Sequence, residues 1–286
     1  MNDQNQQTEI SKSGEKDKEK FQVHLNQPYI RDNYIGTGKL KNKVSIITGG
    51  DSGIGRSVAL HYAREGAEIA IVYLKSDEDA AETQKMVENE GSTCLLFRGD
   101  ISIESFCRKV VTETYEHFNR LDILVNNAGT HEDAPEVKEI SQEQLIRTFS
   151  VNMFSFFYFT KAALEFMKSG SIIINTASVV AYRGSGHLLD YSASKGAVVT
   201  FTRSLAENLA EKNIRVNGIA PGPIWTPLVI YSFDADHLEK FGKDTTMGRA
   251  GYPKEVAPAY VWLASDESSY MTGQMIHING GDIING

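Results

Sequence analysis

The chain has few cysteines, few prolines and few tryptophans. Among its 286 residues are 2 Cys, 7 Pro and 2 Trp. The spacing of Cys94 and Cys107 is not that of metal ligands, and two cysteines do not build a disulfide framework. This scarcity excludes a zinc-stapled or disulfide-stapled fold and favours a reducing compartment, so we expect a cytoplasmic protein.

Long apolar runs and a basic surplus are also missing. No run approaches the roughly 18–20 residues that cross a membrane, and the polar start, Met1–Asn5, has no apolar stretch typical of a secretory signal. The formal net charge is −8. Nucleic acid, anionic lipid and acidic carrier proteins would be repelled at long range, so we expect neither a nucleic acid nor a membrane as partner.

Composition divides the chain into three parts. Residues 1–20 are almost entirely polar and predict a disordered tail. Residues 21–42 place apolar side chains between turn formers, which predicts an extended N-terminal arm that lies on the domain or on a neighbouring subunit. Residues 43–286 form the globular domain.

Short apolar strands alternate with helices along this domain. The predicted strands are Val44–Thr48, Ile69–Tyr73, Thr93–Phe97, Leu121–Val125, Ser171–Thr176, Ile214–Ala220 and Met275–Asn279. Strands that are apolar on both faces need helices on both sides. The pattern therefore predicts an α/β fold with a single, doubly wound, seven-stranded parallel sheet.

One predicted helix is apolar all round. It begins at Ser141, which forms a capping box with Gln144, and continues to residue 168 through an aromatic-rich stretch from Phe149 to Phe159. A second helix, residues 193–212, carries an apolar stripe. Because a sheet covers only one face of a helix, we expect these two helices to build a homo-oligomer, a tetramer. A tightly packed monomer core is the alternative.

Glycines 49, 53 and 55 lie between a predicted strand and a predicted helix. Gly49 permits a tight turn, and the later glycines let the backbone approach a pyrophosphate at the helix N-terminus. The spacing is G-x-x-x-G-x-G, and no Gly-Lys-Ser/Thr follows, which excludes a Walker-type phosphate loop. The turn is typical of a dinucleotide site.

Tyr191 and Lys195 stand four residues apart, so a helix would place them on one face. A free tyrosine titrates near pH ~10, and a neighbouring cation lowers that pKa. A tuned tyrosine beside a nucleotide turn would move a proton while a cofactor moves a hydride.

With these motifs in order, the chain from Lys43 to Gly286 resembles the short-chain dehydrogenase/reductase family, whose members have a Rossmann fold. The resemblance rests on the glycine turn, on Asp100, on the segment Asn126–Gly129, on Pro221–Thr226 and on the C-terminal Asn279-Gly-Gly. Four positions match the catalytic residues of the family: Asn152, Ser178, Tyr191 and Lys195. The resemblance implies a cofactor site formed by Gly49, Asp51, Ser52, Gly53, Ile54, Gly55, Tyr73, Lys75, Asp100, Ile101, Asn127, Ala128, Gly129, Tyr191, Lys195, Pro221, Gly222, Ile224 and Thr226.

The resemblance also implies a mechanism, in which an alcohol and a carbonyl are interconverted with NAD or NADP. Tyr191 would exchange a proton with the substrate oxygen, and Lys195 would lower the pKa of Tyr191. Ser178 would hydrogen-bond the same oxygen, and Asn152 would hold a water that connects Lys195 to solvent.

The choice between NAD and NADP depends on three residues. The family's NAD-selecting acid falls where this chain has Tyr73, and Lys75 could contact a 2′-phosphate. Asp51 in the turn would suit a free ribose better than a phosphate. On the strength of Asp51 the sequence favours NAD over NADP.

The substrate end is less specific. We expect the loop 181–190 and the segment 225–249 to border the substrate, the latter as an irregular lid. His131 and His187 are candidate contacts, and a polyol, sugar or small hydroxy-ketone would suit such a mixture of groups; no metal cluster is expected. The alternatives are a 3-oxoacyl-carrier-protein reductase, a dehydratase or epimerase, and a non-catalytic nucleotide-sensing protein on the same fold.

Overall fold

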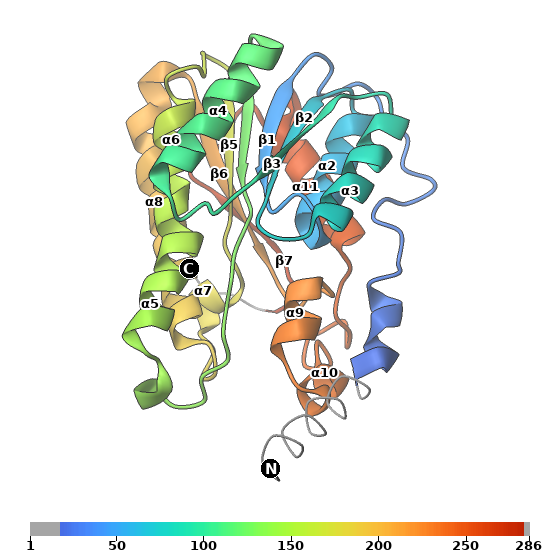
Figure 1. Cartoon of the computed structure of the whole chain (residues 1–286), viewed down its shortest axis with the longest axis vertical. Helices are drawn as coiled ribbons and strands as arrows, with labels where there is room; N and C mark the ends of the chain where they lie inside the picture. Colours follow the sequence, from blue (N-terminus) through green and yellow to red (C-terminus); the bar gives the residue numbers. More distant parts are fainter. Residues whose placement is uncertain (1–17, 283–286) are drawn as a thin grey trace, which may run out of the picture.

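A seven-stranded parallel sheet forms the centre of the computed structural model, which describes residues 18–282 (Figure 1). Its strands are β1 (Val44–Thr48), β2 (Glu68–Tyr73), β3 (Cys94–Arg98), β4 (Ile123–Asn126), β5 (Ile172–Thr176), β6 (Arg215–Pro221) and β7 (Met275–Ile278). They lie in the order β3-β2-β1-β4-β5-β6-β7. The predicted doubly wound α/β sheet is confirmed, and every strand was predicted to within two residues at each end.

Helices cover both faces of the sheet, as Figure 1 shows. One face is covered by α2 (Gly53–Arg64), α3 (Asp77–Asn89) and α11 (Pro253–Ala264), the other by α4 (Glu104–Phe118), α6 (Ser155–Ala163) and α8 (Leu189–Leu209). The shorter elements are η1 (Glu19–His24), η2 (Val137–Glu139), α5 (Gln142–Phe149), η3 (Ser150–Phe154), α7 (Val180–Arg183), η4 (Ala210–Lys212), α9 (Pro227–Ser232), α10 (Ala235–Lys240) and η5 (Asp266–Ser268).

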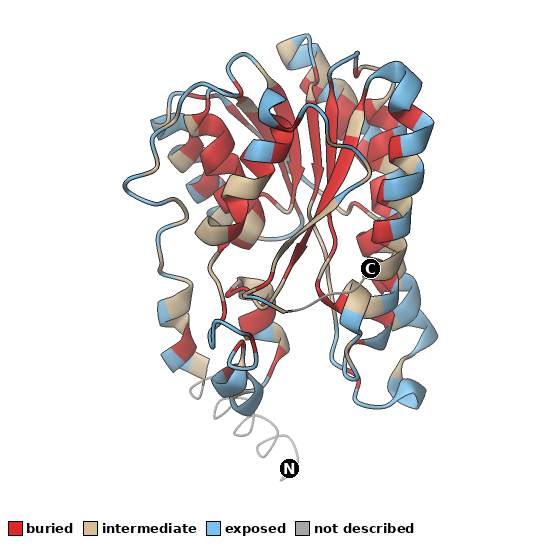
Figure 2. Ribbon diagram, turned by 180° about the vertical axis from the view of Figure 1, so that it is seen from behind, coloured by how far each residue is buried: buried red, intermediate tan, exposed pale blue. Residues whose placement is uncertain are grey.

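The apolar runs of the strands explain the two-sided cover. Ile46 packs under α4 and α6, whereas its neighbour Ile47 packs under α2 and α11. Successive side chains of a strand point to opposite faces, so a run that is apolar throughout needs helices on both. Figure 2 shows the central strands buried along their length.

The predicted helix over residues 141–168 is wrong in its continuity. Ser141 caps α5 by accepting a hydrogen bond from the Gln144 amide at 3.0 Å, as expected. The helix then widens into η3, a π-helical turn, before α6 continues to Ala163. A π-turn inserts one extra residue and is common at functional sites. Here it carries Asn152.

The helix predicted to begin at residue 193 begins earlier, at Leu189. Tyr191 and Lys195 therefore both lie on α8, one turn apart.

Residues 18–42 run along the outside of α2. Glu19 and Lys20, predicted as part of the disordered tail, belong to η1, and residues 1–17 lie outside the described residues. The Glu65 carboxylate at the end of α2 accepts hydrogen bonds from the Tyr34 hydroxyl (2.6 Å) and from the Thr37 and Lys39 amides (2.9 and 3.0 Å). The predicted arm thus lies on its own domain.

The sequence also predicted no disulfide framework and no membrane span. The thiols of Cys94 and Cys107 are free and buried. Within residues 18–282 no helix combines the length and the apolarity needed to cross a membrane.

Candidate active site

A cavity of about 1240 Å³ opens at the carboxyl edge of the sheet. In parallel α/β sheets ligands bind at this edge, where the strand order reverses. Here the reversal falls between β1 and β4. Of the predicted site residues, Gly55 and Asn152 lie behind the cavity wall and all the others line it.

The glycine turn forms one end of the cavity. Gly49 has a left-handed backbone, with φ +65°, and a Cβ on Gly55 would stand 1.9 Å from the Gly49 carbonyl oxygen. Ser52 precedes α2 in an extended conformation, and its side chain caps no amide. Gly53 and Ile54 at the start of α2 line the cavity, and the first amides of a helix, which have no partner within it, are suited to bind an anion.

A threonine on β1 braces this turn against β4. The Thr48 hydroxyl accepts hydrogen bonds from the Asn127 amide at 2.9 Å and the Ala128 amide at 3.0 Å. The Asn127 side chain donates to the Thr48 carbonyl at 3.0 Å. The segment after β4 is thus fixed to the turn by hydrogen bonds of its backbone amides and of the Asn127 side chain. Gly129 continues the same cavity wall.

Tyr73, Asp51 and Lys75, which are predicted to bind the adenosine end of the cofactor, lie on the far side of the turn. The Tyr73 hydroxyl is hydrogen-bonded to Asp77 at 2.8 Å. Burial raises the pKa of the Asp51 carboxyl. Lys75 lines the cavity and makes no ion pair with any residue of 18–282.

Asp100 and Ile101 follow β3 and line the same part of the cavity. Asp100 binds the Arg147 guanidinium at 2.7 Å and the Ser102 amide at 2.9 Å. Burial alone would raise the pKa of Asp100, but these hydrogen bonds hold it below its ordinary value. Asp100 is therefore an anion with two protein partners.

The opposite end is built from the segment after β6. The Gly222 amide donates to the Ile278 carbonyl, and a Cβ on Gly222 would stand 2.6 Å from the Asn279 Cα. Ile224 pairs with Gly251 in an isolated bridge. Thr226 caps α9 by accepting from the Val229 amide at 3.4 Å. Pro221 ends β6 at this wall.

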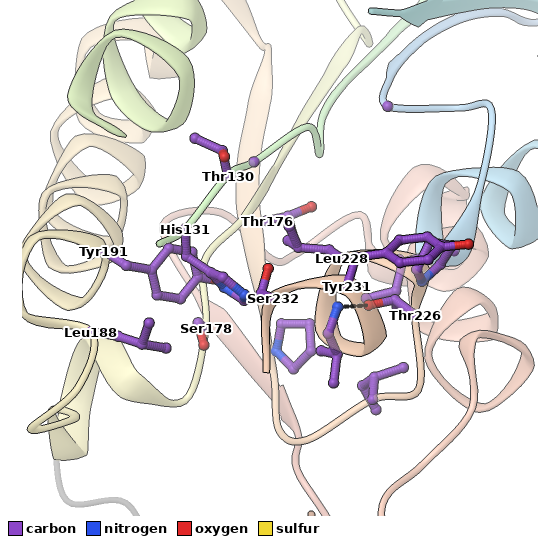
Figure 3. Close-up of a pocket in the computed structure, with 18 of the residues that line it drawn as sticks. Thr130, His131, Thr176, Ser178, Leu188, Tyr191, Thr226, Leu228, Tyr231 and Ser232 are labelled. Atoms are coloured by element: carbon purple, nitrogen blue, oxygen red, sulfur yellow. Dashed lines mark hydrogen bonds between the residues drawn. The ribbon is translucent and has the colours of Figure 1, made fainter. Parts of the chain in front are cut away.

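Tyr191 and Ser178 face the cavity from α8 and from the end of β5 (Figure 3). Lys195 lies one turn below Tyr191, and its Nζ is 5.7 Å from the Tyr191 ring centroid. That Nζ donates to the Thr176 carbonyl at 2.8 Å. The predicted juxtaposition of phenol and amine is present, but the amine bonds to β5 and not to the phenol.

The expected lowering of the tyrosine pKa is not seen in the protein alone. Burial raises the pKa of Tyr191 to about 12, although hydrogen bonding with Ser178 opposes that rise. Burial also lowers the pKa of Lys195 to about 7. Burial, and not the lysine charge, therefore sets the direction of the Tyr191 pKa shift.

Asn152 holds the wall behind Lys195. Its Oδ1 accepts from the Thr130 amide at 2.8 Å, and its Nδ2 donates to the Thr130 carbonyl and to the Ser194 hydroxyl. A Cβ on Gly129 would contact both Asn152 Oδ1 and Lys195 Nζ at 3.4 Å. Gly129 therefore leaves the space between the two groups open.

The substrate side is a wall of two short helices, not the irregular lid that was expected. The wall segment, residues 225–252, contains α9 and α10 and presents Ser232 and Phe233 to the cavity. His187 lines the mouth with an exposed side chain.

His131 lies deeper. Its ring is 5.3 Å from the Tyr191 ring, edge to face, and 5.2 Å from the Phe233 ring. Burial lowers its pKa to about 4, so the ring is neutral at neutral pH. His131 Nε2 is buried and has no hydrogen-bond partner among residues 18–282.

Sequence reasoning missed Thr176 and Arg147. Thr176 could have been found as the last residue of a predicted strand, at the edge where ligands bind. Arg147 gave no signal, because its approach to Asp100 depends on where α5 packs.

The arrangement fits a dinucleotide. The cavity exceeds the ~300–1,000 Å³ common for ligand pockets, and it has an anion site at one end and a titratable phenol at the other. Among residues 18–282 no cluster of three His, Cys, Asp or Glu side chains has metal-binding geometry.

Known proteins share both sequence and fold with this chain. A family model described as enoyl-(acyl carrier protein) reductase matches residues 49–282. The chain is 48% identical to an NADPH-dependent aldehyde reductase of Arabidopsis thaliana, over 90% of this chain and 92% of that protein. It is 46% identical to a glucose and ribitol dehydrogenase of Daucus carota, over 92% of this chain and 94% of that protein. A short-chain dehydrogenase of Burkholderia cenocepacia in complex with NADP superposes with a TM-score of 0.80 at 29% identity, covering 85% of this chain and 98% of its own.

Fold, cavity and relatives together define an oxidoreductase with a nicotinamide cofactor. The chain belongs to the short-chain dehydrogenase/reductase family.

Proposed function

We propose that this enzyme interconverts an alcohol and a carbonyl on a small polyhydroxylated substrate, with NADP as cofactor and Tyr191 as general acid and base. The convergence of Ser178, Tyr191 and Lys195 on the cavity that holds the glycine turn carries this proposal. The names of two relatives, an aldehyde reductase and a glucose and ribitol dehydrogenase, agree with it.

The bound nicotinamide would supply the hydride chemistry, and the protein would orient the reactants and move the proton. Tyr191 gives a proton to the substrate oxygen in reduction and removes it in oxidation. Ser178 donates a hydrogen bond to the same oxygen and stabilises the charge that grows on it.

Lys195 must be protonated for this chemistry, since only an ammonium favours the phenolate form of Tyr191. The Thr176 carbonyl, 2.8 Å away, accepts a hydrogen bond from that ammonium. We propose that Asn152 and the open space at Gly129 connect Lys195 to solvent, so that the proton leaves on this side.

Tyr191→Phe removes the hydroxyl and keeps the ring. Because general acid–base help is worth ~10²–10⁴-fold, turnover should fall at least ~10²-fold, while the cofactor Kd stays within about twofold of that of the wild type. Steady-state rates and cofactor fluorescence titration measure the two effects. Tyr182→Phe, whose hydroxyl lies on α7 away from the cavity, is the control. Full activity in Tyr191→Phe would refute the assignment.

The cofactor preference that the sequence favoured, NAD, depended on Asp51. In the folded protein Asp51 shares the cavity lining with a cation, Lys75. No acid ends β2, where Tyr73 stands, and the cavity-lining Lys75 lacks an ion pair among residues 18–282. Since one relative is named for NADPH and one solved neighbour holds NADP, we propose NADP as the preferred cofactor.

Lys75→Ala tests this preference. A charged hydrogen bond to a phosphate is worth roughly 1.5–3 kcal/mol, so kcat/KM with NADP should fall on the order of 10–100-fold. The value with NAD should not change. Lys85→Ala, an exposed lysine on α3, controls for net charge. An equal loss with both cofactors would contradict a 2′-phosphate contact.

The substrate class is inferred from the wall around Tyr191. His131 offers a buried, unpartnered Nε2, and Ser178 and Ser232 add hydroxyls. A buried polar atom without a partner is costly, and a substrate hydroxyl would satisfy it. An acyl chain, as in a carrier-protein reductase, would leave these groups unsatisfied, which favours a polyol or sugar over that alternative.

His131→Phe keeps the aromatic packing and removes both ring nitrogens. The KM for a polyol such as ribitol should rise at least ~10-fold, since a site built for a hydroxyl group loses its partner. The KM for the cofactor should not change, and an unsubstituted ketone should be reduced as well as before. A uniform loss across polyols and simple ketones would mean that His131 only packs.

We also propose that the enzyme is a homo-oligomer, a tetramer, that uses helices 141–168 and 193–212. Phe154 and Phe157 are 44% and 51% exposed, and the Phe157 ring packs at a tilt against the Phe201 ring of α8, with 4.3 Å between the centroids. Exposed large apolar patches mark interaction sites. Phe157→Glu should sediment as a smaller species than the wild type, whereas Ile35→Glu on the arm should not. Wild-type protein that sediments as a monomer would contradict this proposal.

A further inference from the structure

The first turn of the N-terminal arm lies against the base of the wall segment, residues 225–252. The His24 ring stacks on the Trp225 indole with a centroid distance of 4.1 Å and an interplanar angle of 2°. Its Nδ1 is 3.1 Å from the Tyr252 hydroxyl. In Figure 1 η1 lies beside α10, at the foot of the molecule.

Trp225 and Tyr252 are the two ends of the wall segment. The chain enters it at Trp225, whose amide donates to the Gly251 carbonyl at 3.0 Å, and the Gly251 amide donates back to Pro223 at 2.9 Å. Between these ends lie α9 and α10, which line the cavity. One imidazole therefore contacts both the entry and the exit of the substrate wall.

Two more contacts extend this junction. Phe21, 7% exposed, packs 6.0 Å from the Trp225 ring, and Lys20 forms an ion pair with Glu239 on α10. On its inner side Trp225 packs against Phe241, at 4.9 Å. The indole thus lies between the arm and the end of α10, so displacement of the arm would expose one of its faces.

The other end of the arm is fixed to the body of the domain. Beyond the Glu65 carboxylate that binds Tyr34, Thr37 and Lys39, the Tyr29 carbonyl accepts a hydrogen bond from Ser57 of α2. The arm therefore spans from α2 to the substrate wall and is fixed at both ends.

The solved neighbour from Burkholderia is covered over 98% of its own length but covers 85% of this chain. The family model matches residues 49–282 and so begins after the arm. The arm therefore lies outside the part of the chain that the family model describes.

We propose that the arm positions the substrate wall, and that His24 is the positioning residue that joins the two ends of this wall. Stacking of His24 on Trp225 and its hydrogen bond to Tyr252 hold α9 and α10 in the geometry that closes the cavity around Tyr191. The proposal rests on the proposed function only in that the wall borders the substrate. His24 itself does not line the cavity.

Hydrogen exchange of the full chain tests the contact without any substrate. In His24→Ala the amides of residues 226–250 should exchange at least ~10-fold faster, while those of β1 and β4 should not change. Tyr252→Phe removes one hydroxyl and should give a smaller increase in the same peptides. Val23→Ala, on the exposed side of η1, is the matched control.

Kinetics of the same variants give the second readout. His24→Ala should raise the KM for the substrate at least ~5-fold and change the cofactor Kd less than twofold, because the glycine turn lies elsewhere. His24→Phe, which keeps the stack, should recover most of the loss.

The outcomes separate the two proposals. Unchanged exchange in the 226–250 peptides of both His24→Ala and Tyr252→Phe overturns the positioning role, whatever the enzyme turns over. Wild-type protein that oxidises no alcohol overturns the proposed function, and the exchange result still decides on the arm. If His24→Ala fails to fold, Tyr252→Phe decides alone.

Discussion

A lysine amine buried beneath Tyr191, the tyrosine that faces the cavity, is the constraint on which the site depends. Lys195 is 2% exposed, and burial lowers its pKa to about 7. The hydrogen bond of its amine to the Thr176 carbonyl ties α8 to the carboxyl end of β5. Because burying an ammonium is costly unless it is hydrogen-bonded, the position of this carbonyl fixes where the charge can reside. Because Tyr191 lies one helical turn from Lys195 on α8, the position of Lys195 also fixes that of Tyr191.

Burial opposes charge on both groups. It favours the neutral phenol and the neutral amine alike, so it works against the ion pair that the proposed mechanism requires. Additional polar groups near Lys195 would shift this balance toward the ammonium and, through it, toward the phenolate.

The fold was predictable because its signal is local. Each strand is a short apolar run such as Val44–Thr48, bounded by turn formers, and the glycine spacing after it locates the turn. Tyr191 and Lys195 were predictable for the same reason, since four residues on a helix fix a face. The π-helical turn at Asn152 was not, because its extra residue is stabilised by hydrogen bonds to Thr130 and Ser194, which are remote in sequence.

The direction of the Tyr191 pKa shift was also beyond the sequence. A nearby lysine lowers a tyrosine pKa only while the lysine is charged, and charge depends on burial, which the folded structure alone reveals. His24 is a similar case. Nothing in residues 18–25 predicts that an imidazole of the arm will stack on an indole two hundred residues later.

The contact between the arm and the wall segment also explains how the wall segment is held in place. Residues 225–252 pack few side chains against the sheet; their apolar residues form a separate cluster with Phe21 and Leu188. Segments with little core of their own open at low free energy. An arm fixed to α2 adds contacts to that cluster, and Tyr191 packs against the same cluster. The arm can therefore stiffen the wall directly beside the tyrosine that faces the cavity.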